Sequence, residues 1–202
     1  MGTEKIVIKS ILTTLAAIVL LFAFMLGALM GLYPATMMEL TYKLGMDEAS
    51  IHYAERAYGW HGEDEYFMAY GMEVAIGMGN YEKIDACGET LISDENFKEY
   101  CARETARLPE GVEMTYDQYV YGQVCVAKYK QGKNAEAVEK AFAWTKGFPK
   151  NNAVVAVLYT ALVEGNTETV AMIKTKMDEV ETNALSQTEK AVFEEAYALI
   201  SK

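Results

Sequence analysis

An uncharged, mostly apolar run over residues 11–33 constrains the fold more than any other feature of the sequence. A helix needs about 20 apolar residues to cross the hydrocarbon core of a bilayer, so this run is long enough to span one. A cleaved signal peptide is the competing interpretation. Its apolar segment is shorter, about 7–15 residues, and it ends at a small-residue cleavage site, which Ala28-Leu29-Met30 fits poorly. The run predicts an uncleaved transmembrane helix over 11–33, preceded by a short head over 1–10.

The charges that flank this run predict its orientation. Lys5 and Lys9 precede it, and Glu39 is the first charged residue after it. Positively charged residues stay on the cytoplasmic side of a membrane. We therefore expect a single-pass protein of the cell membrane, with a cytoplasmic N-terminus and with residues 34–202 outside the cytoplasm.

Three small residues within the run are spaced by four. Ala23, Gly27 and Gly31 fall on one face of a helix, and together they form a small-xxx-small ridge. Such a ridge lets two helices approach closely in lipid. It predicts pairing of the span with a second copy of itself or with the span of another protein.

Glycines recur between the helical segments of the remaining chain. Gly45, Gly79, Gly132 and Gly165 each follow one run of helical periodicity and precede another, in steps of 34, 53 and 33 residues by subtraction of these positions. A period in the low thirties is typical of stacked two-helix units. We expect an all-α fold over 34–202, with about four helical hairpins and a C-terminal capping helix.

The clearest unit lies between Gly132 and Pro149. Ala137, Ala141 and Trp144 fall on one face of the predicted helix, four and three residues apart. The small alanines allow a neighbouring helix to approach closely, and the glycine and proline bound the segment. The pattern predicts one half of a helical hairpin with a docking face.

Local signals predict where several helices begin. Asn134 can cap the helix that follows Gly132. Thr115-x-x-Gln118 and Ser186-x-x-Glu189 are capping boxes. The 53-residue step leaves room for one more helix near 94–108, and Asp94 is its expected cap.

This arrangement resembles the tetratricopeptide (TPR) repeat family over roughly 33–181. The positions that carry the resemblance are Gly45, Ala54 and Ala57 in the first unit, Gly79 in the second, Gly132, Ala137 and Pro149 in the third, and Gly165 in the fourth. The resemblance implies an α-solenoid, a fold that presents a surface to protein partners. The helix near 94–108 is then an insertion of about half a repeat.

The net charge of −11 bears on the class of partner. Binding to nucleic acid needs a basic face that neutralises phosphates, so we expect no nucleic-acid partner. The sequence contains no glycine-rich phosphate loop, no dinucleotide-binding glycine set and no His-Glu-x-x-His motif. We expect no cofactor, no metal and no catalytic residues.

Two groups of residues suggest a metal site or a disulfide and are weighed against simpler explanations. The segment over 61–65 combines His61 with three acidic residues and could form a weak metal site, but acidic residues are expected at a helix start as partners of its dipole. Cys87, Cys101 and Cys125 fit buried thiols on helices. A Cys87–Cys101 disulfide is the alternative if this part is exported.

Tyrosine is frequent in the chain, with 14 copies. We expect some of these side chains to pack in the core. Others, with Tyr66, Tyr70, Tyr119 and Tyr121 as candidates, would line a groove, since amphipathic aromatic residues are favoured at protein-binding surfaces.

These observations predict a membrane-anchored protein-interaction module, a scaffold or adaptor that binds a protein partner through a helical-repeat groove. The alternative is an accessory subunit of a membrane enzyme or transporter complex, in which other chains cover the glycine face of the span and the inserted region. An enzyme would need polar residues that converge in a pocket, and the sequence points to none.

Overall fold

The computed structural model describes residues 2–60 and 64–201, and these residues form α-helices with no β-strand. The helices are α1 (Gly2–Leu32), α2 (Pro34–Lys43), α3 (Asp47–Trp60), α4 (Glu65–Met78), α5 (Tyr81–Ser93), α6 (Phe97–Thr105), α7 (Tyr116–Lys130), α8 (Asn134–Trp144), α9 (Ala153–Val163), α10 (Thr167–Asp178) and α11 (Gln187–Ile200). A short 3₁₀ turn, Thr182–Ala184, precedes α11. The all-α prediction is confirmed for the described chain.

Helix α1 is long and apolar enough to cross a membrane over Ser10–Leu32, and none of that segment is buried inside the molecule. By length and composition a signal sequence near the N-terminus passes the same test. The helix begins at Gly2, so residues 2–10 of the expected head belong to the same helix as the apolar run.

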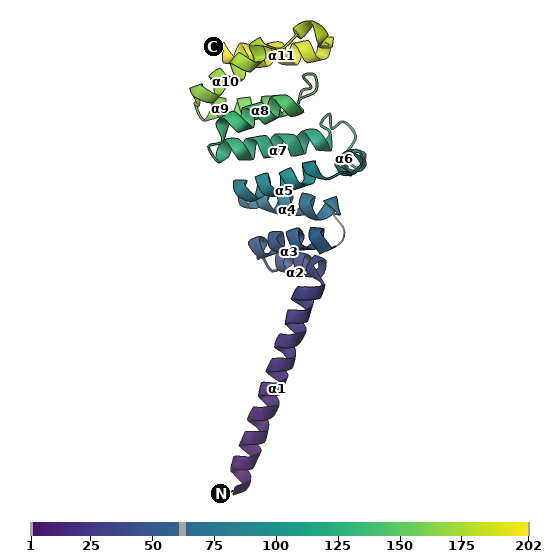
Figure 1. Ribbon diagram of the computed structural model, residues 1–202, viewed down its shortest axis with the longest axis vertical. Coiled ribbons are helices and arrows are strands. Elements are labelled where there is room, and N and C mark those ends of the chain that lie inside the picture. The colour runs from purple at the N-terminus through teal and green to yellow at the C-terminus, as the bar shows by residue number, and fades with distance from the viewer. Residues whose placement is uncertain (1, 61–63, 202) are drawn as a thin grey trace.

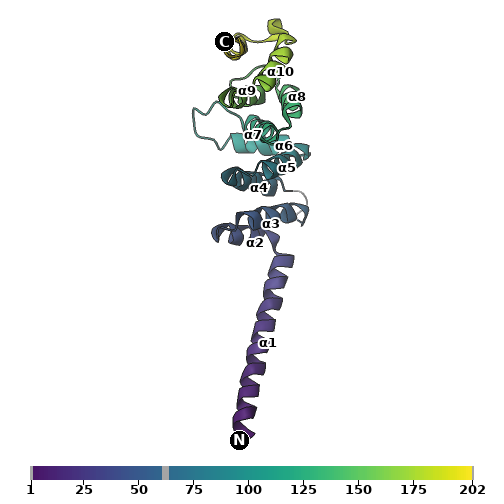
Figure 2. The same ribbon diagram turned by 90° about the vertical axis from the view of Figure 1, so that its left-hand side faces the viewer.

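The other helices lie roughly crosswise to the long axis of the molecule and follow one another along it, whereas α1 runs along that axis (Figures 1 and 2). Packing follows chain order: α2 lies on α3, α3 on α4, α4 on α5 and α5 on α7. Beyond α7, both α8 and α9 pack on it, and α10 packs on α8 and α9. Helix α6 leaves this series and contacts α7 from the side.

The predicted inserted helix is present but shorter than expected. It covers Phe97–Thr105 rather than 94–108, because the chain first makes a turn around Asp94. The carboxylate of Asp94 accepts a hydrogen bond from the backbone N–H of Asn96 at 2.9 Å, and its backbone carbonyl accepts from Phe97. Asn96, and not Asp94 as expected, occupies the N-cap position of α6, and Asp94 stabilises the turn before it.

Glycines end helices where the sequence predicts it. Gly79 follows α4 with a φ of 67° and Gly132 follows α7 with a φ of 78°. This left-handed conformation costs a residue with a Cβ atom about 1–2 kcal/mol, which explains the glycines. Gly45 and Gly165 take the same conformation after α2 and α9.

The two predicted capping boxes are confirmed, at Thr115 before α7 and at Ser186 before α11. The prediction for Asn134 is wrong. Lys133 occupies the N-cap position of α8 without a side-chain hydrogen bond, and Asn134 is already the first residue of the helix. The turn after Gly132 is one residue shorter than a cap at Asn134 requires.

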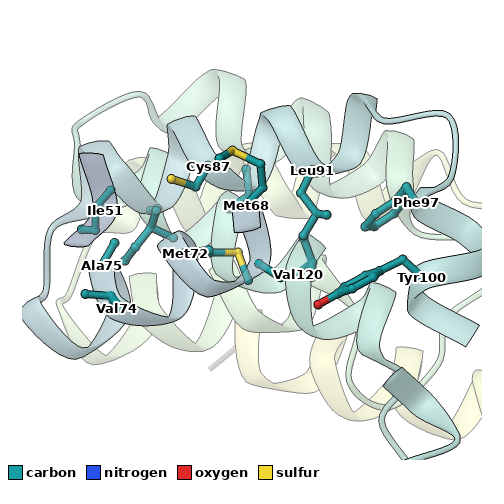
Figure 3. Packing of buried hydrophobic residues seen from close by; sticks show 14 of the residues in the cluster. Ile51, Met68, Met72, Val74, Ala75, Cys87, Leu91, Phe97, Tyr100 and Val120 are labelled. Carbon is teal, nitrogen blue, oxygen red and sulfur yellow. The ribbon is translucent and has the colours of Figure 1, made fainter. Parts of the chain in front are cut away.

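The helices bury three adjoining apolar clusters. The central cluster joins side chains of α3 to α7. Figure 3 shows it extending from Ile51 at one end to Phe97 at the other, with Met72, Leu91 and Val120 between them. A smaller cluster lies between α2, α3 and α4, and a larger one joins α7 to α11. The alanines predicted to pack at close approaches, Ala54, Ala57, Ala137 and Ala141, are all buried.

Candidate functional site

A cavity of about 490 Å³ opens on the face that α7, α9 and α11 share. Its apolar wall consists of Val126, Val155, Ala156, Val192 and Ala196. Polar side chains border it as well, including Gln118, Gln123, Asn151, Tyr159 and Glu195. We call this cavity the α7–α9–α11 groove.

Gly122 opens the floor of the groove. It lies within α7, and a Cβ atom placed there would meet only the Cβ of Ala156, at 3.8 Å. This is an ordinary contact distance, so the space above Gly122 is not needed for packing between α7 and α9. The missing side chain instead leaves room for a group that enters from outside.

The amide side chains around the groove differ in their hydrogen bonding. Asn152 is committed to the helix start, since its Oδ1 accepts from the backbone N–H of Val155 at 2.9 Å. The Oε1 of Gln118 accepts from Thr115 in the capping box at 3.2 Å. Among the described residues, the amides of Gln123 and Asn151 make no side-chain hydrogen bond. Each offers both donors and an acceptor to a bound chain.

Tyr119 connects the groove to α4. Its hydroxyl donates a hydrogen bond to the Oε2 atom of Glu73 at 3.0 Å. Desolvation raises the pKa of both groups. The neighbouring carboxylate of Glu73 raises the pKa of Tyr119 further, whereas the hydrogen bond from Tyr119 lowers the pKa of Glu73 in part. The Tyr119 ring also lies 5.8 Å from that of Tyr116.

Tyr66 and Tyr70 lie farther along the molecule, on α4. Their ring centroids are 6.1 Å apart, and Tyr70 meets the ring of Tyr42 from α2 at 5.8 Å, edge to face. Burial raises the pKa of Tyr70. Two of the four candidate tyrosines therefore lie together at the α2–α4 end of the molecule.

Tyr121 lies elsewhere. It lines a second cavity, of about 560 Å³, with residues of α6, α7 and the end of α8. Its ring stacks on that of Trp144 at 4.9 Å and lies 5.6 Å from Phe97. Residues two apart on a helix point in nearly opposite directions. Tyr119 and Tyr121 therefore lie at different cavities, and the four candidate tyrosines do not share one surface.

The small residues of the span lie at its surface. Ala23 and Gly27 are exposed, and no side chain lies within 4 Å of a Cβ built at Gly27 or Gly31. The backbone carbonyl of Gly31 accepts a hydrogen bond from Arg56 of α3 at 3.4 Å. The ridge is thus uncovered except where the first hairpin meets its end.

The structure also contains a charge network around a buried lysine, which the sequence analysis did not predict. The ammonium of Lys128 on α7 lies 2.6 Å from Asp85 and 3.0 Å from Glu89, both on α5, and 2.9 Å from Glu136 on α8. Lys133 and Lys140 pair with the same carboxylates, at 3.1 Å from Asp85 and 2.6 Å from Glu89.

This network shifts two pKa values. Burial by itself would lower the pKa of Lys128, but the hydrogen bonds to its three carboxylates outweigh burial and raise it. Burial would raise the pKa of Asp85, but the hydrogen bonds from Lys128 and Lys133 lower it. Both groups are therefore held in their charged forms, and they connect α5, α7 and α8.

A signal for this network exists in the sequence. Val120, Val124 and Lys128 are spaced by four, so the lysine occupies a core position on the stripe of two buried valines. A buried charge needs partners. The spacing of four between Asp85 and Glu89 places both partners on one helix face.

The cysteines do not form the disulfide considered above. Cys87, Cys101 and Cys125 are separate, buried thiols. Burial raises the pKa of each to about 12, which keeps them protonated at neutral pH. Among the described residues, no group of His, Cys, Asp and Glu is arranged to hold a metal ion. The candidate metal residues His61 and Glu63 lie outside the described residues.

Comparisons with known proteins identify no relative: no family model, curated protein or solved structure matches the chain.

Proposed function

We propose that this chain is a membrane-anchored protein-interaction module. In this proposal α2 to α11 form a TPR-like α-solenoid, α1 is an uncleaved anchor in the cell membrane, and the N-terminus lies in the cytoplasm. The α7–α9–α11 groove is the observation that carries the proposal. It combines an apolar wall with amides that have no partner among the described residues, and ligand sites in proteins commonly pair these two features.

The chemistry of the groove favours an extended segment of a protein partner. The amides of Gln123 and Asn151 can each donate to and accept from a peptide backbone. The valines and alanines provide contact area for apolar side chains, and the exposed ring of Tyr159 can cover such a side chain. Lys150 and Glu195 contribute one charge of each sign at the border, and Lys150 also pairs with Glu113 at 3.4 Å, so the groove offers little net charge to a bound segment.

Paired variants of one residue test this proposal. Gly122→Leu would place a side chain in the groove, and it should not disrupt α7, because leucine has a higher helix propensity than glycine. Gly122→Ala adds only a contact of ordinary length. We expect partner capture from gently solubilised membranes to fall at least about tenfold with Gly122→Leu, equivalent to about 1.4 kcal/mol, and to persist with Gly122→Ala.

A second pair controls for general loss of apolar surface. Tyr159 and Val163 are both exposed on α9, but only Tyr159 lines the groove. Tyr159→Ala should weaken capture and Val163→Ala should not. Equal capture by all four variants would show that the partner binds elsewhere and would overturn the assignment of the groove.

The alternative is an accessory subunit of a membrane complex, and the uncovered ridge of Ala23, Gly27 and Gly31 favours it. Gly27→Leu and Gly31→Leu would block close approach of another span. Loss of capture with these variants, but not with Gly122→Leu, would favour this alternative. The same ridge would also serve a homodimer, which cross-linking in membranes distinguishes by the mass of the product.

A further inference from the structure

The junction between α1 and the first hairpin is short and hydrogen-bonded. Only Tyr33 separates α1 from α2, and it continues the helical hydrogen bonding on both sides. Its N–H donates to the carbonyl of Leu29 at 3.0 Å, and its own carbonyl accepts from Met37 at 3.1 Å. Arg56 of α3 adds the hydrogen bond to Gly31. One residue and three hydrogen bonds therefore hold the α2–α3 hairpin next to the end of the span.

The hairpin is also held together internally. Ser50 of α3 donates a side-chain hydrogen bond to the carbonyl of Met38 on α2 at 2.9 Å, and both residues are buried. The buried face of α2 consists of Pro34, Met37, Met38 and Thr41. This hydrogen bond and the buried face hold α2 against α3. Among the stacked helices, α2 is the one nearest to α1 (Figures 1 and 2).

Large apolar side chains remain exposed at this end of the molecule. We define the juxtamembrane patch as Tyr33, Leu40, Leu44 and Met46, all of which are exposed, Leu44 by 65%. Leu40 and Leu44 are four residues apart and share one flank of α2. By contrast, α8, α10 and α11 have no exposed large apolar side chain in the described chain. Exposed large apolar side chains also occur elsewhere, such as Trp60, Tyr66 and Val163, but they lie on separate helices, α3, α4 and α9, whereas the four residues of the patch follow directly after the span in the chain.

The length of the span fixes the depth of this patch. Ser10–Leu32 has 23 residues, so at 1.5 Å per residue it measures about 35 Å, slightly more than the hydrocarbon thickness of about 30 Å. Tyr33 then lies at the boundary between hydrocarbon and headgroups, where tyrosine is favoured. Because only Tyr33 separates α1 from α2, α2 then begins at headgroup depth.

We infer that the α2–α3 hairpin rests on the bilayer, with Leu40, Leu44 and Met46 inserted into the lipid interface beside α1. This inference rests on the proposed anchor. Interfacial segments bury their apolar side chains by about 5–10 Å at the boundary between headgroups and acyl chains. The polar residues of α2 suit this depth, since Glu39 and Lys43 form an exposed ion pair at 3.9 Å that can remain among the headgroups.

The consequence concerns the groove. A hairpin that rests on the lipid removes the freedom of a tethered domain, so the stacked helices rise from the membrane in one orientation. The α7–α9–α11 groove is then presented at a fixed height and direction. Lipid contact thus determines where a partner can bind.

Fluorescence quenching by lipid tests the inference in the full-length chain. The native cysteines are buried and protonated at neutral pH, so one introduced, exposed cysteine can be labelled selectively. We would attach a bimane probe to Leu44→Cys in the patch, Leu20→Cys in the span and Val163→Cys on α9. Each protein would be reconstituted into phosphatidylcholine vesicles whose acyl chains carry bromine either near the headgroup or near the chain end.

We expect strong quenching at residue 20 by deep bromine, quenching at residue 44 by shallow bromine, and none at residue 163. Quenching at residue 20 without quenching at residue 44 would overturn the inference and leave the anchor intact. Absence of quenching at residue 20 would overturn the anchor and, with it, the inference. If residue 44 is shielded from aqueous iodide but not quenched by lipid, protein covers the patch, and the inference is wrong.

Discussion

The Nζ atom of Lys128 lies 2.6 Å from Oδ1 of Asp85, and both side chains are almost wholly buried between α5 and α7. Glu89, Glu136 and Lys133 complete the charge network around them, and apolar clusters lie on both sides of it. The pair lies where the helices before the inserted α6 meet those after it. Such a buried charge pair disfavours other packing registers of α7 on α5, because any shift would leave a buried charge without its partner.

Removal of the central cation should destabilise the fold strongly. In Lys128→Met the buried carboxylate of Asp85 keeps only Lys133 and Gln131 as partners. We expect a loss of about 3 kcal/mol in the free energy of unfolding, in the range typical for breaking a buried pair. Urea denaturation of the protein in detergent, followed by circular dichroism, measures this change.

An exposed pair provides the control. Lys150 and Glu113 lie 3.4 Å apart with most of both side chains in solvent, and such pairs contribute little. Glu113→Gln should leave the denaturation midpoint unchanged. Equal effects of Lys128→Met and Glu113→Gln would contradict a special role for the buried network.

The network should also make stability depend on acid. The folded pKa of Asp85 lies below its ordinary value of 3.8, so its charged form stabilises the folded state above that pH. This contribution is lost as the pH falls through the folded pKa. The raised pKa of Lys128 keeps its contribution complete below its ordinary value of 10.5.

We therefore expect the difference in melting temperature between the wild type and Asp85→Asn to stay constant from about pH 5 to pH 8. It should shrink below about pH 4. Thermal unfolding across this range measures it. A difference that grows on acidification would contradict the sign of the Asp85 pKa shift.

Gly88 allows α5 to approach α7 closely. A Cβ atom at this position would lie 2.2 Å from Cγ2 of Val124, far inside contact distance. Gly88→Ala should therefore cost about 1–3 kcal/mol, as overpacked cores do. Adding Val124→Ala should recover part of this loss, since it removes the atom that clashes. Chemical denaturation of the wild type, the two single variants Gly88→Ala and Val124→Ala, and the double variant gives the coupling energy.

Gly77 is the matched control because it lies in α4 with an ordinary helical φ, and a Cβ atom placed there would have no other atom within 4 Å. Gly77→Ala should stabilise the protein by up to about 1 kcal/mol through helix propensity. A stabilising Gly88→Ala would show that α5 and α7 are less closely packed than the structure has them.

The thiols should be unreactive in the folded protein. Because burial raises the pKa of Cys87, Cys101 and Cys125 to about 12, little thiolate exists at pH 8. A disulfide reagent that releases a coloured thiol should react with none of them in detergent and with all three after denaturation. Rapid reaction in the folded state would show that at least one of these side chains is accessible.

Local chemistry made much of the helical layout predictable. The capping boxes at Thr115 and Ser186 and the glycines at 79 and 132 act within four residues of the chain, so their effect needs no knowledge of the fold. The absence of charge over residues 11–33 acts in the same way, because it leaves one apolar helix with no polar face. The prediction of Asn134 as the cap was wrong because the N-cap position shifts by one residue with the geometry of the preceding turn, and the sequence pattern does not distinguish the two positions.

Contacts between distant residues were decided by the tertiary structure alone. Lys128 finds Asp85 and Glu136 only when α5, α7 and α8 meet, and Gly88 is needed only because Val124 lies opposite it. The rotation of α7 separates Tyr119 from Tyr121, although the two are close in sequence. The sequence determined where helices begin and end and which segments are apolar, since these properties depend on residues that are close together in the chain. Which faces meet, and so which side chains form the groove, depends on how whole helices pack.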